Sequence, residues 1–305
     1  MARSIPWEGT RWYTAAVPIL RLRDDLGREL TFASPPARIV SLVPSDTHSL
    51  CALGLTPRLV ARTRYCDVPE AAHVPAICGT KDVDVEAIVA LSPDVVIANQ
   101  EENSRAPLEA LAQRGVKVFV SLPRRVEDAL AHLARLARLC GVAEDPSVVE
   151  LLRRGYRALT PPAEGAALRV TAFVPIWLDP LMTFNGDTFG SDVLACCGVA
   201  NAFVDRLRLY PLAADLGKSA PVDAGARDVR YPRVSFDEVR KRAPALVLLP
   251  DEPHEFSADD LALIERELPD AKVVRCSGRD LFWYGAWTID AVPRLRAALA
   301  AVIGD

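Results

Sequence analysis

The sequence predicts an α/β protein built from two Rossmann-like lobes with mostly parallel sheets, joined by a single long connecting helix. Three observations lead to this fold class: the length of the chain, an internal repeat, and strands without polar alternation. The 305 residues exceed what one hydrophobic core usually serves, so two lobes are expected. Half of the residues are hydrophobic and a quarter are charged, as in ordinary globular proteins.

An internal repeat relates the two halves of the chain. Residues 85–101 match residues 236–252 without gaps. Each copy reads as a short helix, a proline break and an all-apolar strand, residues 95–98 in the first copy and 246–249 in the second. Such strands are typical of parallel sheets that helices cover on both faces. The repeat therefore predicts one mostly parallel sheet in each lobe.

A helical pattern separates the two copies. Residues 145–159 carry apolar side chains at helical spacing, Asp145 can cap the start, and Pro161-Pro162 end the pattern. One helix of this kind would join the lobes stiffly. The expected segments are an N-terminal extension with a strand that leads into the fold (1–36), an N-terminal lobe (37–143), a linking helix (144–162) and a C-terminal lobe (163–305).

Composition and charge exclude several classes of function. The net charge is −4 and the basic residues are scattered among acids, so no nucleic-acid surface is expected. No apolar run reaches the roughly 18–20 residues of a membrane-spanning helix. The seven cysteines contain no CxxC pair, which argues against a disulfide framework and a structural zinc site, and no metal site is predicted.

The first twenty residues do not read as a signal peptide, because polar residues and a proline interrupt the apolar stretch. No lipidation site follows them. The chain as it stands is therefore expected in the cytoplasm. If a leader was removed or the start is misassigned, a periplasmic or extracytoplasmic location is expected instead.

Candidate ligand-binding residues follow from the rule that open parallel sheets bind ligands beyond the carboxyl ends of their strands. Those ends carry polar side chains in both halves and many aromatic rings in the second half, which suits a large, flat ligand. The residues singled out are Pro44, Ser45, Tyr65, Thr80, Lys81, Gln100, Glu101, Asn103, Trp177, Phe184, Gly186, Thr188, Asp251, Glu252, Phe256, Phe282, Trp283 and Tyr284.

Catalytic and metal-binding alternatives have weaker support. A serine, an aspartate and a histidine lie within residues 45–48, but triads assemble from separate segments and no GxSxG elbow is present. Ser45 is expected to cap the helix that begins there. The acidic pairs at 101–102 and 251–252 could form a carboxylate cluster, and His254 could be an axial ligand of a metal macrocycle. No enzyme is predicted.

Several short motifs follow one another in a fixed order along the chain, at residues 38–45, 52–54, 84–88 and 93–96. In this order, over roughly residues 25–300, they resemble the substrate-binding components of ABC importers for cobalamin, iron siderophores and haem, a type also called helical backbone metal receptors. Trp177 and residues 278–285 are most similar to the cobalamin-binding members.

The resemblance implies a monomeric binding protein that holds cobalamin or a related corrinoid between its lobes and delivers it to an ABC permease dimer. The corrinoid would be a ligand, with no covalently bound cofactor. One alternative is a ferric-siderophore or haem-binding protein, for which Tyr65 and His254 are the candidate ligands to iron. Another is a cytosolic metallochaperone or enzyme on the same fold, since fold alone does not fix function.

The resemblance also implies two docking positions. In the importer family, one acid on each lobe pairs with arginines of the permease. The repeat aligns Glu86 with Asp237, each at the start of the short helix before the proline break. Acids in a first helical turn are also favoured by the helix dipole, so a purely local role is the alternative.

Overall fold

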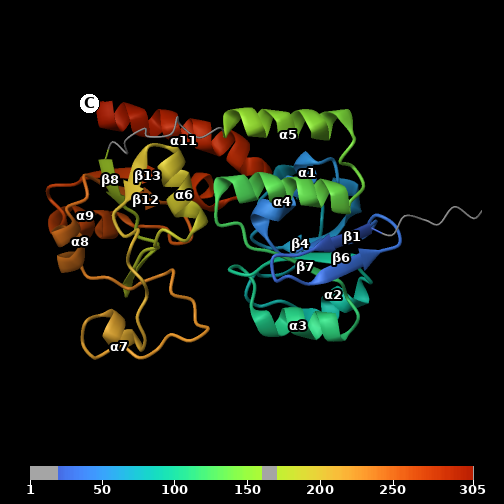
Figure 1. Cartoon of the computed structure of the whole chain (residues 1–305), viewed down its shortest axis with the longest axis horizontal. Helices are drawn as coiled ribbons and strands as arrows, with labels where there is room; N and C mark the ends of the chain where they lie inside the picture. The colour runs from blue at the N-terminus through green and yellow to red at the C-terminus, as the bar shows by residue number, and fades with distance from the viewer. Residues whose placement is uncertain (1–19, 160–169, 305) are drawn as a thin grey trace, which may run out of the picture.

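The computed structural model describes residues 20–159 and 170–304 and places them in two α/β lobes, with a layer of long helices over both (Figure 1). The described chain begins with an antiparallel hairpin, β1 (Leu20–Arg23) and β2 (Glu29–Phe32). The turn is fastened by Asp24, which accepts the backbone N–H of Arg28 at 2.9 Å. Asp25 accepts the N–H of Leu122 at 2.7 Å. The expected lead-in strand is therefore a hairpin anchored to the N-lobe.

The N-lobe is built on a five-stranded parallel sheet in the order β5-β4-β3-β6-β7. Its strands are β3 (Ile39–Ser41), β4 (Leu59–Thr63), β5 (Ala76–Cys78), β6 (Val95–Asn99) and β7 (Val118–Ser121). Its helices are α1 (Pro44–Ala52), α2 (Val85–Ala90), α3 (Arg105–Gln113) and α4 (Val126–Leu139), with short 3₁₀ helices at Thr56–Arg58 and Pro69–Ala71.

Helices cover both faces of this sheet, as the apolar strand pattern predicts. α1 and α4 lie on one face, and α2 and α3 lie on the other (Figure 1). Ile97 of β6 belongs to the same core as Leu130 of α4, whereas Val96 shares a core with Ile88 of α2 and Leu111 of α3. Every residue of β6 is buried, which explains why this strand has no polar alternation.

The C-lobe repeats this plan on a four-stranded parallel sheet, β11-β8-β12-β13. Its strands are β8 (Val170–Phe173), β11 (Val199–Asn201), β12 (Leu246–Pro250) and β13 (Lys272–Cys276), beside a small hairpin of β9 (Trp177–Leu178) and β10 (Leu181–Met182). Its helices are α6 (Phe189–Cys196), α7 (Leu212–Asp215), α8 (Phe236–Arg242), α9 (Ala258–Glu267) and α10 (Gly278–Phe282).

The internal repeat is confirmed at the level of topology. The N-lobe order β4-β3-β6-β7 recurs in the C-lobe as β11-β8-β12-β13. The lobes differ between the outer strand and the next helix. The N-lobe returns to its sheet there as β5, whereas residues 202–235 of the C-lobe leave the sheet as a long excursion that carries α7 (Figure 1). No repeat unit exists for that excursion, so the sequence pattern did not predict it.

The connecting helix is present as α5 (Pro146–Ala158). Asp145 takes its N-cap position but makes no side-chain capping hydrogen bond, and Pro161-Pro162 lie outside the described residues. A second long helix, α11 (Ala286–Gly304), packs against α1, α4 and α5 and also against α6 and α10. Within the described ranges, no helix combines the length and the apolar character needed to cross a membrane.

Because α11 packs against both lobes, the junction between them is a hydrophobic core and not a single flexible linker. One cluster of buried side chains contains Leu133 of α4, Leu194 of α6, Tyr284 and Ile289. Gly285, between α10 and α11, has a positive φ of 77°, and a Cβ there would lie 2.2 Å from the Ser49 hydroxyl of α1. Only glycine accommodates both the backbone angle and the close approach.

We predict that the lobes move little when a ligand binds. α11 packs against helices of both lobes, and separating the lobes would expose apolar surface at a cost of about 25 cal/mol per Å². X-ray scattering profiles with and without cobalamin, the ligand that the resemblance implies, should nearly overlap. A contraction of several ångströms in the radius of gyration would contradict this prediction.

Candidate ligand-binding cleft

A cavity of about 960 Å³ lies between the two lobes. Its walls come from the segments that follow β3, β4, β5 and β6 in the N-lobe and β12 and β13 in the C-lobe. The carboxyl ends of parallel strands meet at one edge of each sheet, and the two edges face each other across this cavity. The volume lies at the upper end of the roughly 300–1,000 Å³ of small-molecule sites, so a large ligand is accommodated.

Most of the sequence-predicted residues line this cavity. From the N-lobe they are Pro44, Ser45, Tyr65, Thr80, Lys81 and Glu101, and from the C-lobe they are Thr188, Glu252, Phe282, Trp283 and Tyr284.

Three predicted aromatic residues lie outside the cavity walls. Phe184 is 1% exposed and Phe256 is 3% exposed, and both fill hydrophobic cores. Trp177 is 45% exposed, and its ring lies 4.9 Å from the ring of His254. His254 also packs on Phe256 at 4.7 Å, away from the cavity lining. Their strand-end positions were predicted, but local packing turns their side chains elsewhere.

The remaining predicted residues support the cleft from behind or face away from it. Asn103 is buried and donates to the carbonyls of Leu42 at 3.1 Å and Thr80 at 2.9 Å. Asp251 accepts the N–H of Gly278 at 2.6 Å. Gln100 is exposed, and Gly186 donates its N–H to the Val204 carbonyl at 2.9 Å.

Ser45 does not cap α1. The N-cap is Val43, with Pro44 in the first helical position, because proline favours that position and starts the helix one residue earlier. The neighbouring acid and histidine do not form a triad with Ser45 either. Asp46 pairs with His132, and His48 packs its ring 5.0 Å from Trp287.

A buried polar network forms the floor of the cleft. The Tyr284 hydroxyl donates to Asp46 at 2.9 Å, and Asp46 contacts Nε2 of His132 at 2.6 Å. The same hydroxyl receives the amide N–H of Asn99 at 3.1 Å and lies 3.0 Å from the Ser121 hydroxyl. Burial raises the pKa of Tyr284 well above its ordinary value, so it stays a hydrogen-bond donor.

The charged lining of the cavity contains more acids than bases. The bases are Arg64, Lys81 and Arg279, and the acids are Asp67, Asp82, Glu101, Glu102 and Glu252. Each base is already engaged within the protein: Arg64 with Asp82 at 2.6 Å, Arg279 with Asp67 at 3.1 Å across the lobes, and Lys81 with the Glu101 carbonyl. In the described residues, no group of three His, Cys, Asp or Glu side chains is arranged to hold a metal ion.

Several cavity residues are absent from the predicted ligand-binding set. Asn99, Glu102 and Phe189 lie in segments at strand ends, which the strand-end rule covers, and they line the cavity as well. Tyr231 also lines the cavity, but it lies on the C-lobe excursion, which has no counterpart in the repeat. No sequence signal placed that segment beside the N-lobe.

The two proposed docking acids occupy equivalent positions. Glu86 is the second residue of α2 and Asp237 is the second residue of α8. Both side chains are about three-quarters exposed (74% and 76%). Each also has a partner on its own lobe: Glu86 contacts Arg114 at 2.7 Å, which lowers the pKa of Glu86, and Asp237 contacts Arg240.

Comparison with solved structures agrees with this architecture. The periplasmic vitamin B12 binding protein BtuF of Vibrio cholerae superposes with a TM-score of 0.65 at 22% identity, over 89% of this chain and 99% of that one. The haem-binding protein RhuT from Roseiflexus sp. RS-1 superposes with a TM-score of 0.67 at 19% identity, over 87% and 98%. At these identities the likeness shows the fold alone.

Comparison with the sequences of known proteins gives relatives at higher identity. A vitamin B12-binding protein of Photorhabdus laumondii is 30% identical over 223 residues, which cover 70% of each chain. A vitamin B12-binding protein of Yersinia pestis is 29% identical over 219 residues, 71% of this chain and 70% of that one. The sequence profile described as "Periplasmic binding protein" matches residues 39–262. The chain therefore belongs to the periplasmic binding protein family.

Proposed function

We propose that this protein captures cobalamin or a related corrinoid in the interlobe cleft and presents it to an ABC permease. The family is one of binding proteins, and the sequence relatives named above are vitamin B12-binding proteins. The proposal includes no catalytic step. The corrinoid would be held as cargo, not as a covalently bound cofactor.

The charge of the cleft is the observation that carries the choice of ligand. Haem propionates and most ferric siderophores bring negative charge. Such a ligand would meet an acid-rich lining in which Arg64 and Arg279 are paired with acids and Lys81 donates to a backbone carbonyl. A negative ligand is disfavoured beside a lining that holds more carboxylates than bases. Cobalamin instead carries neutral carboxamide groups around its ring, and their N–H groups can donate to carboxylates such as Glu101 and Glu252.

The aromatic wall supports the same choice. Phe189, Phe282 and Trp283 line the C-lobe side of the cavity, and Tyr65 lines the N-lobe side. Tyr65 is 55% exposed, and Arg64 lies over its ring at 5.1 Å from the centroid, so the exposed part of the ring can contact a ligand. Aromatic faces on opposite walls suit a flat macrocycle.

A spectral titration tests this proposal. The purified protein should bind cyanocobalamin at one site, with a shift in the visible bands of the corrin and quenching of tryptophan fluorescence. Haem and a ferric catecholate chelate should bind much more weakly under the same conditions. Tight haem binding without cyanocobalamin binding would instead favour the haem alternative.

We predict that the Trp283 ring contributes to ligand affinity. Trp283 is 7% exposed and packs on Trp287 at 5.3 Å, so truncation to alanine would also damage the core, and Trp283→Phe is the cleaner variant. It should weaken cyanocobalamin binding by about 0.5–1.5 kcal/mol. Trp177→Phe, outside the cavity, is the matched control and should keep wild-type affinity. Equal affinities for all three proteins would place Trp283 in a packing role only.

We further propose that Glu86 and Asp237 dock the protein on a dimeric permease. Two exposed acids in equivalent helices suit a symmetric partner. The variant with both Glu86→Arg and Asp237→Arg should lose cobalamin uptake in cells while its affinity for cyanocobalamin stays unchanged. A control with Glu150→Arg and Glu265→Arg, on α5 and α9, should keep uptake.

This docking proposal requires the protein to lie outside the cytoplasm, which cell fractionation measures. If fractionation finds the protein in the cytoplasm and the docking variant keeps its cellular role, the two acids act only at the starts of their helices. Their local stabilisation would then be about 0.3–1 kcal/mol each through the helix dipole.

A further inference from the structure

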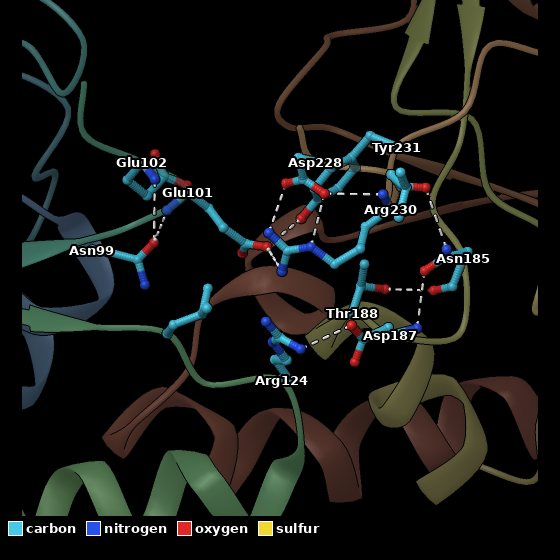
Figure 2. A network of polar contacts seen from close by, with 12 residues as sticks. Asn99, Glu101, Glu102, Arg124, Asn185, Asp187, Thr188, Asp228, Arg230 and Tyr231 are labelled. Carbon is cyan, nitrogen blue, oxygen red and sulfur yellow. Dashed lines mark hydrogen bonds and ion pairs between the residues drawn. The ribbon is translucent and has the colours of Figure 1, made fainter. Parts of the chain in front are cut away.

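The C-lobe excursion reaches back to the N-lobe beside the cleft. Its outer part carries α7, and its returning part carries Asp228, Arg230 and Tyr231 before α8 begins. Figure 2 places these three side chains opposite the segment that follows β6, which carries Glu101. The N-lobe has no equivalent excursion, so this contact is a one-sided addition to the symmetric plan.

Glu101 receives two side chains from the other lobe. Nη1 of Arg230 lies 2.5 Å from Oε1 of Glu101, and the Tyr231 hydroxyl donates to the same oxygen at 2.8 Å. The arginine contact is an ion pair without an aligned hydrogen bond. Asp228 holds the far side of the guanidinium at 2.6 and 2.9 Å. We call Glu101, Arg230 and Tyr231 the clasp.

The segment that carries Glu101 is itself fixed in place. The backbone N–H of Glu101 donates to the Asn99 side chain at 2.7 Å, and its carbonyl accepts from Lys81. Glu101 lines the cavity, as does Tyr231, whereas Arg230 stands behind them and is 7% exposed. Both clasp contacts fall on Oε1, so Oε2 is the oxygen of this carboxylate that can accept from a ligand.

The charge of Glu101 depends on the clasp. Burial raises the pKa of the Glu101 carboxyl, and Arg230 and the Tyr231 hydrogen bond oppose that rise. A partly buried carboxylate that loses its cation tends to take up a proton. A protonated Glu101 would no longer present a charged acceptor to the N–H groups of a ligand, and charged acceptors make the stronger hydrogen bonds.

We propose that Arg230 and Tyr231 are positioning residues for ligand recognition: they hold Glu101 ionised through Oε1, leave Oε2 to accept from a ligand, and so make the C-lobe excursion part of the binding site. The inference rests on the proposed function only in taking the cleft as the ligand site. The proposal predicts that removal of the Arg230 side chain, which does not line the cavity, changes the pH dependence of ligand binding.

The first experiment needs no ligand. The pKa of Glu101 is measured by carbon NMR of glutamate-labelled protein, with Glu101→Gln to assign its signal. Arg230→Gln should raise the pKa of Glu101 by about 1–3 pH units, and Arg230→Lys should restore part of the change. Tyr231→Phe, which removes only a hydroxyl, should give a smaller rise and serves as the second variant if Arg230→Gln does not fold.

The matched control is Arg124→Gln. Arg124 also bridges the lobes, at 2.9 Å from Asp187, but both of these side chains are nearly half exposed, and Arg124 is the weakest of the charges that act on Glu101. Its removal should raise the pKa of Glu101 less than the removal of Arg230. An unchanged pKa in both Arg230→Gln and Tyr231→Phe would overturn the proposal.

The second experiment measures cyanocobalamin affinity across pH. Arg230→Gln should bind about tenfold more weakly where its Glu101 is protonated and regain affinity as the pH rises above the new pKa. Glu101→Gln should remove this pH dependence. An affinity loss that is equal at every pH would mean that Arg230 has only a structural role. If the wild-type protein does not bind cyanocobalamin, the proposed ligand is wrong, and the NMR experiment still decides the clasp.

Discussion

The hydroxyl of Tyr284 contacts three N-lobe side chains, Asp46, Asn99 and Ser121, and the apolar packing around it continues from one lobe into the other. If the lobes separated, the buried hydroxyl would lose these hydrogen bonds, at a cost of about 1–3 kcal/mol in the free energy of folding. The apolar side chains around it would also become exposed to water. The distance between the two strand-end edges is therefore set by packing. The cleft above this floor is largely pre-formed, which lowers the ordering cost of binding a ligand.

A pre-formed cleft makes its charge pattern matter more, because its walls cannot rearrange freely to suit a ligand. Arg64 and Arg279 on the walls are paired with acids, and Lys81 donates to a carbonyl. Burial raises the pKa of the Glu252 carboxyl in the same lining. Such a site would suit the hydrogen-bond donors of the neutral ligand that we propose better than the charge of a negative ligand. The cavity is large enough for a macrocycle. Because the bases in its lining already have partners, a macrocycle with uncharged substituents would fit it better than one with negative substituents.

Sequence patterns predicted the parts of the molecule that repeat. The apolar strands β6 and β12, the connecting helix α5 and the position of the cavity at the strand ends follow from periodicity and from the rule for parallel sheets. Side-chain direction did not follow: Phe184 and Phe256 stand at predicted strand ends yet point into cores. Strand ends position a backbone, and which way each ring turns depends on neighbours far away in the sequence, such as Phe282, which lies 5.8 Å from the Phe184 ring.

The part of the structure that the sequence predicted least well is the C-lobe excursion, which has no counterpart in the N-lobe. Glu86 and Asp237 could be paired from the repeat alone, because each lobe supplies one copy of the same helix start. The clasp could not, because Arg230 lies in a segment that only the C-lobe has. The symmetric part of the chain thus builds two facing sheets and a matched pair of surface acids, suited to a symmetric partner. The asymmetric part reaches across one side of the cleft and supplies Arg230 and Tyr231, which we propose position Glu101 for ligand recognition.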